Sequence, residues 1–310
     1  MRWSYSAALQ FMSCERKWYY SHKYARFNSS DEDKRQAAYL KDAMSLDEWK
    51  GTVVDTVISM FIHRENKYEK NPTLDDYINE ARRITKMQFA FASDRRWEQI
   101  TTKSTLKDGN EYTVLEPLLS HKQIPQAEKQ RIWQEIKNAL EIYYEDEDFQ
   151  YDYCQPATHH FTQYPLVMKR QDVTIKGVPD LLLFYEDNPP LIVDWKVYRD
   201  STYSHKRQLM MYAYMLSNLS SIPAKFPDSF KEYSISHYRL CEYQLLTGEK
   251  RFYTIDEQDI HDASEFISEA VYRMKKKQCH LPPAKLSELM FNEAYSPMSC
   301  ENCNFSSICW

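Results

Sequence analysis

The stretch GVPDLLLFYEDNPPLIVDWKVYRD, residues 177–200, sets three charged side chains into two apolar runs. DLLLFY and LIVDWKV are typical of strands and flank the turn-forming segment EDNPP, so the pattern predicts an antiparallel hairpin. We place Asp180 opposite Lys196 and Asp194 opposite Leu182. Because side chains alternate faces along a strand, Asp180, Asp194 and Lys196 then share one face near one end of the hairpin.

This placement predicts a metal site. Two neighbouring carboxylates raise each other's pKa unless a cation lies between them, and oxygen ligands suit Mg²⁺ or Mn²⁺. Such an ion can hold a scissile phosphate and convert a bound water into a nucleophile, with Lys196 orienting the water or stabilising the transition state. The hairpin alone also allows a simple buried ion pair between Asp180 and Lys196, with Asp194 at the strand edge.

The motifs PD at 179–180 and DWK at 194–196 resemble the signature of the PD-(D/E)XK nucleases. RQLMMYAYML, residues 207–216, also places Gln208 and Tyr212 as in the Q-x-x-x-Y helix that follows the lysine strand of RecB-like nucleases. Residues four apart share one helix face, so this amide and this phenol can reach the same phosphate or the lysine.

The resemblance implies an α/β fold with a restriction-endonuclease-like core: a small mixed sheet flanked by helices, with a helical insert and a clasp that joins the chain ends. It implies a Mg²⁺- or Mn²⁺-dependent DNA nuclease, most specifically a single-strand exonuclease. The segments expected in one discontinuous domain are an N-terminal helix and cluster ligand (1–50), a mostly helical insert (51–150), the nuclease core (151–270) and a basic helix with a cluster-binding segment (271–310). The catalytic residues it implies are Asp180, Asp194, Lys196, Gln208 and Tyr212.

Relatives of this type usually carry G-x-x-x-H in an early helix, and its histidine is a metal ligand. Here the matching segment runs from Gly51 to Asp55. We therefore expect Asp55 to join Asp180 and Asp194 as a metal ligand, the alternative being a helix N-cap. The acidic residue common on the strand before the first aspartate has no match, since HHFTQYPL offers only Gln163 and two histidines.

Four of the seven cysteines form a second pattern. SCENCNFSSIC supplies Cys300, Cys303 and Cys309, and Cys14 stands far away in FMSCERKWYY. This layout resembles the iron-sulfur RecB-like nucleases, including the CRISPR-associated exonucleases and the nuclease of the AddB helicase subunit. It implies a [4Fe-4S] cluster on these four thiolates, with tetrahedral Zn²⁺ as the competing occupant. It also makes a helicase or another DNA-processing protein a possible partner.

The composition of the chain excludes several other classes of protein. Only four glycines occur, which excludes a glycine-rich phosphate loop or a dinucleotide fingerprint. No apolar run approaches the length of a membrane span and the start lacks a secretion signal, so we expect no membrane contact and an intracellular, cytoplasmic protein. The net charge of −5 leaves nucleic-acid binding to local sites.

One such site is the segment at 81–103, where cations outnumber acids and Phe89, Phe91 and Trp97 are interleaved. It predicts a track for single-stranded DNA if these rings stack on bases, or a solvated helix surface over an aromatic core if they do not. Two further functions stay open. One is a catalytically weak DNA-binding or assembly subunit, and the other is a zinc-stapled RNA-processing nuclease.

Overall fold

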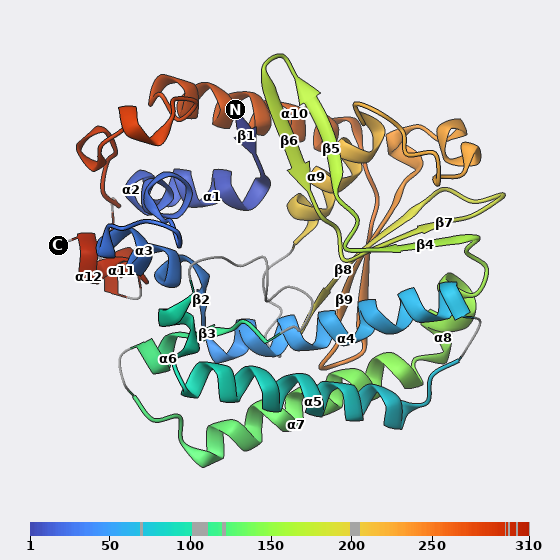
Figure 1. Ribbon diagram of the computed structural model, residues 1–310. Helices are drawn as coiled ribbons and strands as arrows, with labels where there is room; N and C mark the ends of the chain where they lie inside the picture. Colours follow the sequence, from blue (N-terminus) through green and yellow to red (C-terminus); the bar gives the residue numbers. More distant parts are fainter. Residues whose placement is uncertain are drawn as a thin grey trace. The chain divides into compact units, whose positions relative to one another are not determined.

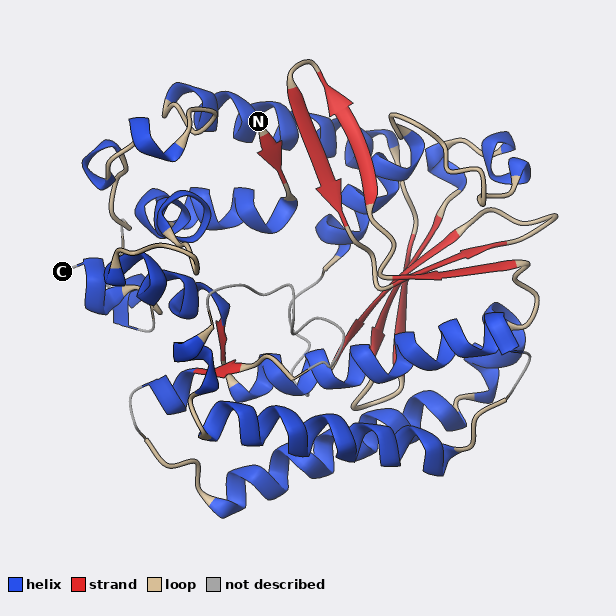
Figure 2. Cartoon of the chain, in the orientation of Figure 1, coloured by secondary structure: helices blue, strands red, loops and turns tan. Residues whose placement is uncertain are grey.

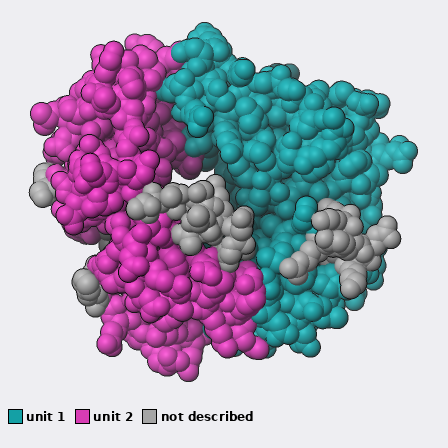
Figure 3. Space-filling model, in the orientation of Figure 1, with its two compact units in different colours: residues 1–5, 50–81, 132–269 teal, residues 6–49, 82–131, 270–310 magenta. Residues whose placement is uncertain are grey.

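The computed structural model divides the chain into two compact units, which Figure 3 colours separately. Unit 1 comprises residues 1–5, 50–81 and 132–269, and unit 2 comprises residues 6–49, 82–131 and 270–310. The structure describes residues 1–68 (without the side chains of 64–68), 71–100, 111–119, 122–198, 205–294, 296, 298–301 and 303–309.

Unit 1 is built on a five-stranded mixed sheet (Figures 1 and 2). The strand order is β10-β9-β8-β7-β4, and only β8 and β9 run parallel. The strands are β4 (His159–Thr162), β7 (Leu181–Phe184), β8 (Leu191–Lys196), β9 (Arg239–Gln244) and β10 (Glu249–Tyr253). A smaller sheet has the order β1-β6-β5, with β1 (Arg2–Trp3), β5 (Leu166–Arg170) and β6 (Val173–Gly177). The expected mixed sheet with flanking helices is thus confirmed.

The hairpin of β7 and β8 forms as predicted but in another register. Leu181 pairs with Val193 and Leu183 with Leu191, so the strands are shifted by two residues from the predicted pairing of Asp180 with Lys196. The connection is longer than the assumed EDNPP turn, because residues 184–190 lie outside the pairing. A shift of two preserves the face on which each side chain lies, whereas a shift of one would have reversed it.

Helices cover both faces of the unit 1 sheet. α9 (Lys206–Ser217) packs against β5, β6, β8 and β9, and its buried side has Leu209, Met211 and Met215 among its residues. The remaining short helices here are α8 (Glu147–Phe149), η3 (Gln150–Cys154), η4 (Asp228–Glu232) and η5 (Ile235–His237). Four long helices supply residues to both units: α4 (Leu46–Tyr68), α5 (Leu74–Ser93), α7 (Gln126–Glu145) and α10 (Glu257–Lys276).

Unit 2 is mostly helical. It contains the strand pair β2 (Ala43–Met44) and β3 (Val114–Leu115). Its helices are α1 (Tyr5–Ser13), α2 (Glu15–Tyr19), η1 (Tyr20–Tyr24), α3 (Glu32–Asp42), η2 (Arg96–Gln99), α6 (Glu116–Leu119), η6 (Pro283–Lys285), η7 (Glu288–Met290), α11 (Met298–Glu301) and α12 (Ser306–Cys309).

The N-terminal helix expected within residues 1–50 is divided, because α1 ends at Ser13 and α2 begins at Glu15, with Cys14 between them. That residue has extended backbone angles, and its Sγ accepts the backbone N–H of Lys17 at 3.3 Å as the N-cap of α2. None of the helices among the described residues has the length and hydrophobicity that a membrane crossing requires.

Candidate active site

The predicted catalytic side chains meet where β7 begins and β8 ends. Asp194 is on β8, a strand buried on both faces, and is itself 1% exposed. Asp180 directly precedes β7, and continuing the observed register past Leu181 brings it opposite Asp194. The structure therefore brings together Asp180 and Asp194, with Lys196 two residues further along β8.

Gln163 joins two of the aspartates, a role that sequence reasoning missed. Its side-chain amide donates to Asp180 Oδ1 at 3.0 Å and to Asp55 Oδ1 at 2.9 Å. Its backbone N–H also donates to the carbonyl of Asp180 at 3.1 Å. Gln163 is exposed, so this side of the site opens to solvent. The position that lacks the family's acidic residue thus holds a neutral donor between two acids.

Asp55 reaches the group from α4. It lies in the third turn of that helix, so the alternative of an N-cap is wrong. The indole N–H of Trp195 donates to Asp55 Oδ1 at 3.0 Å. Trp195 and Asp194 are neighbours on a strand and point to opposite faces, so Asp55 approaches β8 from the face opposite Asp194. The backbone N–H of Trp195 completes the connection by donating to Asp180 Oδ2 at 3.0 Å.

The crowding of negative charge is visible in the pKa values. Burial, together with the charges of Asp194 and Asp55, raises the pKa of Asp180 well above its ordinary value. Burial and the charge of Asp194 raise the pKa of Asp55, while the donors Trp195 and Gln163 oppose that shift. Carboxyls that repel each other in this way are the physical signature of a site that needs a cation.

The cation that the chain itself supplies is Lys196. Its ammonium is in contact with Asp194 Oδ2 as an ion pair, although that oxygen accepts no well-directed hydrogen bond. Burial alone would lower the pKa of Lys196, but the charges of Asp194 and Asp180 outweigh it and raise the pKa. One ammonium beside three carboxyls leaves the group negative overall.

α9 carries the remaining predicted pair, Gln208 and Tyr212, whose side chains are in contact. The Gln208 amide donates to Asp194 Oδ1 at 3.1 Å and to the Tyr212 hydroxyl at 2.9 Å, and its Oε1 lies 3.5 Å from Lys196 Nζ. Burial, then the charge of Asp194, raises the pKa of Tyr212, so its hydroxyl stays protonated at neutral pH. Gln208 therefore orients both the acid and the base of the DWK motif.

The donor chemistry of this group fits a hard cation, since carboxylate and amide oxygens are the ligands that Mg²⁺ and Mn²⁺ prefer. In the structure, the side chains of this group are spaced as hydrogen-bonded partners. Among the residues that the structure describes, no three His, Cys, Asp or Glu side chains converge closely enough to hold an ion. Gln163 and Trp195 stand between the aspartates in the geometry seen here. An ion would therefore have to replace these donors.

The four cysteines predicted as cluster ligands lie around one pocket of unit 2, but as placed they too do not converge closely enough to hold a metal ion. Cys14, Cys300, Cys303 and Cys309 line one small pocket, with Phe305 on its wall. An Arg16 guanidinium nitrogen lies 3.9 Å from the Cys309 sulfur and donates to it. Burial raises the pKa of Cys309, as do the nearby charges of Cys14 and Cys303, while Arg16 opposes the rise.

Among the described residues of the segment at 81–103, two of the three rings of the predicted aromatic track are buried, while Phe89 is half-buried. Trp97 is fully buried and Phe91 is 2% exposed, so neither ring can stack on a base. Arg95 and Arg96 lie over these two rings as cation–π partners. The alternative of a solvated surface over an aromatic core is confirmed for these residues, while Lys103 lies outside the described residues.

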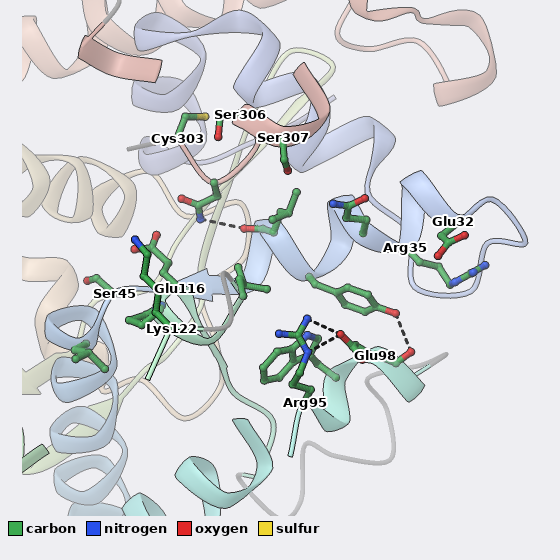
Figure 4. A pocket seen from close by; sticks show the side chains of 18 of the residues that line it. Glu32, Arg35, Ser45, Arg95, Glu98, Glu116, Lys122, Cys303, Ser306 and Ser307 are labelled. Carbon is green, nitrogen blue, oxygen red and sulfur yellow. Dashed lines mark hydrogen bonds and ion pairs between the residues drawn. The ribbon is translucent and has the colours of Figure 1, made fainter. Parts of the chain in front are cut away.

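A pocket of about 960 Å³ in unit 2 includes part of this segment (Figure 4). Arg95 and Glu98 lie at its wall as an ion pair, with the Nε to Oε1 distance at 2.7 Å. Glu116 and Lys122 lie elsewhere on the lining, and burial raises the pKa of Glu116. Charges of both signs alternate here, which is unlike the uniformly basic surface that binds a phosphate backbone.

Comparisons with known proteins identify the family of the chain. A model of the PD-(D/E)XK nuclease superfamily matches residues 2–310. Nucleases of that superfamily generally use divalent metal ions such as Mg²⁺ or Mn²⁺. Among solved structures, SSO0001 is similar at 12% identity and a TM-score of 0.30, over 86% of both chains. A Eubacterium rectale protein provisionally named an exonuclease is similar at 10% identity and a TM-score of 0.34, over 88% of this chain and 92% of that one. A search of curated proteins finds no match.

Proposed function

The chain belongs to the PD-(D/E)XK nuclease superfamily, and we propose on that basis that it hydrolyses phosphodiester bonds of DNA, as an exonuclease on single strands. The observation that carries the proposal is the connected group of Asp180, Asp194, Lys196 and Gln208 beside the exposed Gln163. Asp194, Lys196 and Gln208 are in direct contact, and Asp180 is linked to them through the backbone N–H of Trp195, the neighbour of Asp194.

Asp180 and Asp194, with Asp55, would hold Mg²⁺ or Mn²⁺ after the Gln163 amide turns away or presents its oxygen. A divalent ion there would hold the scissile phosphate and lower the pKa of a bound water. Lys196 lies beside Asp194 and is kept charged by it, so its ammonium can orient that water or neutralise a phosphate oxygen. Gln208 positions the lysine, because its Oε1 accepts from the Lys196 ammonium. The Tyr212 hydroxyl in turn accepts from the Gln208 amide and holds that side chain in place.

The decisive experiment uses purified protein, Mn²⁺ and labelled single-stranded DNA. Lys196→Met removes the ammonium and keeps most of the side-chain length, and we expect cleavage to fall at least about a hundredfold. Lys176→Met, an exposed lysine of β6 in the same unit, is the matched control and should cleave like the natural protein. Binding without cleavage by any of the three would favour a DNA-binding or assembly subunit, for which a helicase is the partner to test by co-purification.

For the clasp we propose a [4Fe-4S] cluster on Cys14, Cys300, Cys303 and Cys309. Support comes from their shared pocket and from the N–H donors at Cys14 and Cys309, which are the type of bond that tunes cluster thiolates. Protein purified without oxygen should be brown and contain about four irons, and colour and iron should be lost on exposure to a chelator.

The clasp test has a matched control in the same unit. Cys303→Ala should abolish the iron content, whereas Cys279→Ala, a buried cysteine outside the pocket, should retain it. A colourless protein with one zinc would instead favour the zinc-stapled alternative. A preference for RNA over DNA of the same sequence would then identify an RNA-processing nuclease.

A further inference from the structure

A second row of polar side chains lies beside Asp194 and Lys196, on the neighbouring strand. β9 runs parallel to β8 in a register that pairs Glu242 with Asp194 and Gln244 with Lys196. Paired residues of parallel strands point to the same face, so all four share the face that α9 covers. Glu242 and Gln244 are both fully buried. Buried polar groups on a central strand cost free energy unless they have partners, so their partners indicate their role.

The carboxylate of Glu242 is the centre of this row. Its Oε2 accepts the backbone N–H of His205 at 2.8 Å and the hydroxyl of Tyr253 at 3.0 Å. Its Oε1 accepts the side-chain amide of Gln244 at 2.7 Å and lies 3.6 Å from a guanidinium nitrogen of Arg251 as an ion pair. Burial alone would raise the pKa of Glu242, but these donors together lower it, so the group is a charged carboxylate in the interior. A buried charge with this many donors is a fixed anchor.

What the anchor holds is the residue that precedes α9. The imidazole Nδ1 of His205 lies 3.5 Å from Glu242 Oε2, so the carboxylate contacts both the backbone and the ring of one histidine. The ring nitrogens also lie 3.1 and 3.2 Å from the hydroxyl of Tyr198. Tyr198 follows Lys196 by two residues along the chain. The row therefore ends two residues along the chain from the lysine of the active site.

Unlike its anchor, the end of the row reaches solvent. The side chain of His205 is 28% exposed, while that of Glu242 is wholly buried. A buried carboxylate that holds a partly exposed imidazole is the arrangement by which enzymes orient a histidine toward a substrate. At the N-terminal end of the 12-residue helix α9, the carboxylate of Glu242 itself is the anion that the helix dipole favours, which further fixes the position of His205.

We propose that His205 and Tyr198 form a subsite for a backbone phosphate of the DNA strand next to the scissile one, and that Glu242 is the positioning residue that holds them. The proposal rests on the proposed nuclease function and extends it by one nucleotide. The hydroxyl of Tyr198 and the imidazole of His205 supply hydrogen bonds to the phosphate oxygens. Lys196, on the same face, marks the side on which the scissile phosphate lies.

The test measures binding separately from cleavage. A short fluorescein-labelled single-stranded DNA is titrated with protein in Ca²⁺, and KM and kcat are measured in Mn²⁺. We expect His205→Ala and Tyr198→Phe each to weaken binding and raise KM about tenfold, as the loss of a hydrogen bond to a charged group implies, with kcat changed less than about threefold. His237→Ala, an exposed histidine, and Tyr214→Phe, which removes a phenol bonded to Ser264, are matched controls and should bind normally.

Glu242 is tested by a double-mutant cycle. If it acts through His205, Glu242→Gln weakens binding alone but adds little to His205→Ala, because the contact it positions is already gone. Unchanged binding of His205→Ala and Tyr198→Phe, with a lowered melting temperature only, would show that the row is purely structural and overturn the subsite. If the natural protein cleaves DNA and these variants bind normally, the subsite is refuted but the nuclease function is not. If the natural protein neither binds nor cleaves DNA, both the nuclease function and the subsite are refuted.

Discussion

Replacing Gln163 by Glu should make the stability of the protein depend on metal. In the structure, the Gln163 amide donates to Asp55 and Asp180 at 2.9 and 3.0 Å. A glutamate at that point removes both donors and brings a further negative charge to the two carboxyls. Its own ligand chemistry, however, is the one that divalent ions prefer. The same substitution should therefore be harmful without metal and favourable with it.

The magnitude follows from the two hydrogen bonds. Each bond to a charged group contributes about 1.5–3 kcal/mol when it is buried, and water replaces part of that at an exposed residue such as Gln163. We expect a net loss of about 2 kcal/mol, which corresponds to a melting temperature lower by about 4–8 °C. An ion present at a hundred times its Kd would restore about 2.7 kcal/mol. The variant should thus recover fully in Mn²⁺.

Thermal unfolding in EDTA and in Mn²⁺ measures this difference. Gln163→Ala removes the donors without adding charge and should be destabilised in EDTA but gain no more from Mn²⁺ than the natural protein. Gln171→Glu is the control for charge and backbone, because Gln171 is also exposed and has φ 54°, close to the φ 49° of Gln163. If Mn²⁺ raises the melting temperatures of natural protein and Gln163→Glu equally, the three aspartates and residue 163 do not share an ion.

Three further predictions concern the same unit. Gly177→Ala should destabilise by about 1–3 kcal/mol and lower kcat, because its Cβ would lie 2.8 Å from Met215 Sδ and 3.1 Å from the Tyr212 ring; denaturant titration and the cleavage assay check this. Gly51→Ala should stabilise by about 1 kcal/mol in the same titration, since the new Cβ would have no atom within 4 Å apart from its chain neighbours and the helix's own backbone, and alanine favours a helix. In EDTA, stability should fall as pH rises through the folded pKa of Asp180, because that pKa is raised and the folded state binds the proton longer than the unfolded state. Asp180→Asn should flatten this dependence in unfolding experiments between pH 4 and about 8.

Local sequence patterns predicted the parts of the candidate site that lie within the β7–β8 hairpin and within α9. The face shared by Asp180, Asp194 and Lys196 was predictable even though the register was not, since an error of two residues keeps side-chain alternation intact. The meeting of Gln208 with Tyr212 required only helical periodicity. Such features depend on neighbours along the chain, which a sequence displays directly.

Features that depend on distant pairing were not predictable. Gln163 looked like the absence of a ligand, and its role appears only when the start of β7 is placed beside the end of β4. Glu242 and His205 meet because β9 pairs in parallel with β8 across a long connection, and no local pattern specifies that register. Cys14 was expected only as a cluster ligand, and its role as the N-cap of α2 depends on a break in the N-terminal helical segment that no local pattern signals.

The active-site carboxyls have partners even without a cation, and this has a consequence for how an ion would bind. Asp180 accepts two N–H groups, and Asp55 accepts an indole and an amide. An ion must displace at least the Gln163 amide, so its binding free energy is reduced by the hydrogen bonds it replaces. Relatives with an acid at that position have no such bonds to break and leave more repulsion for the ion to relieve. This chain should therefore fold readily without metal and bind it more weakly than a variant with glutamate at residue 163.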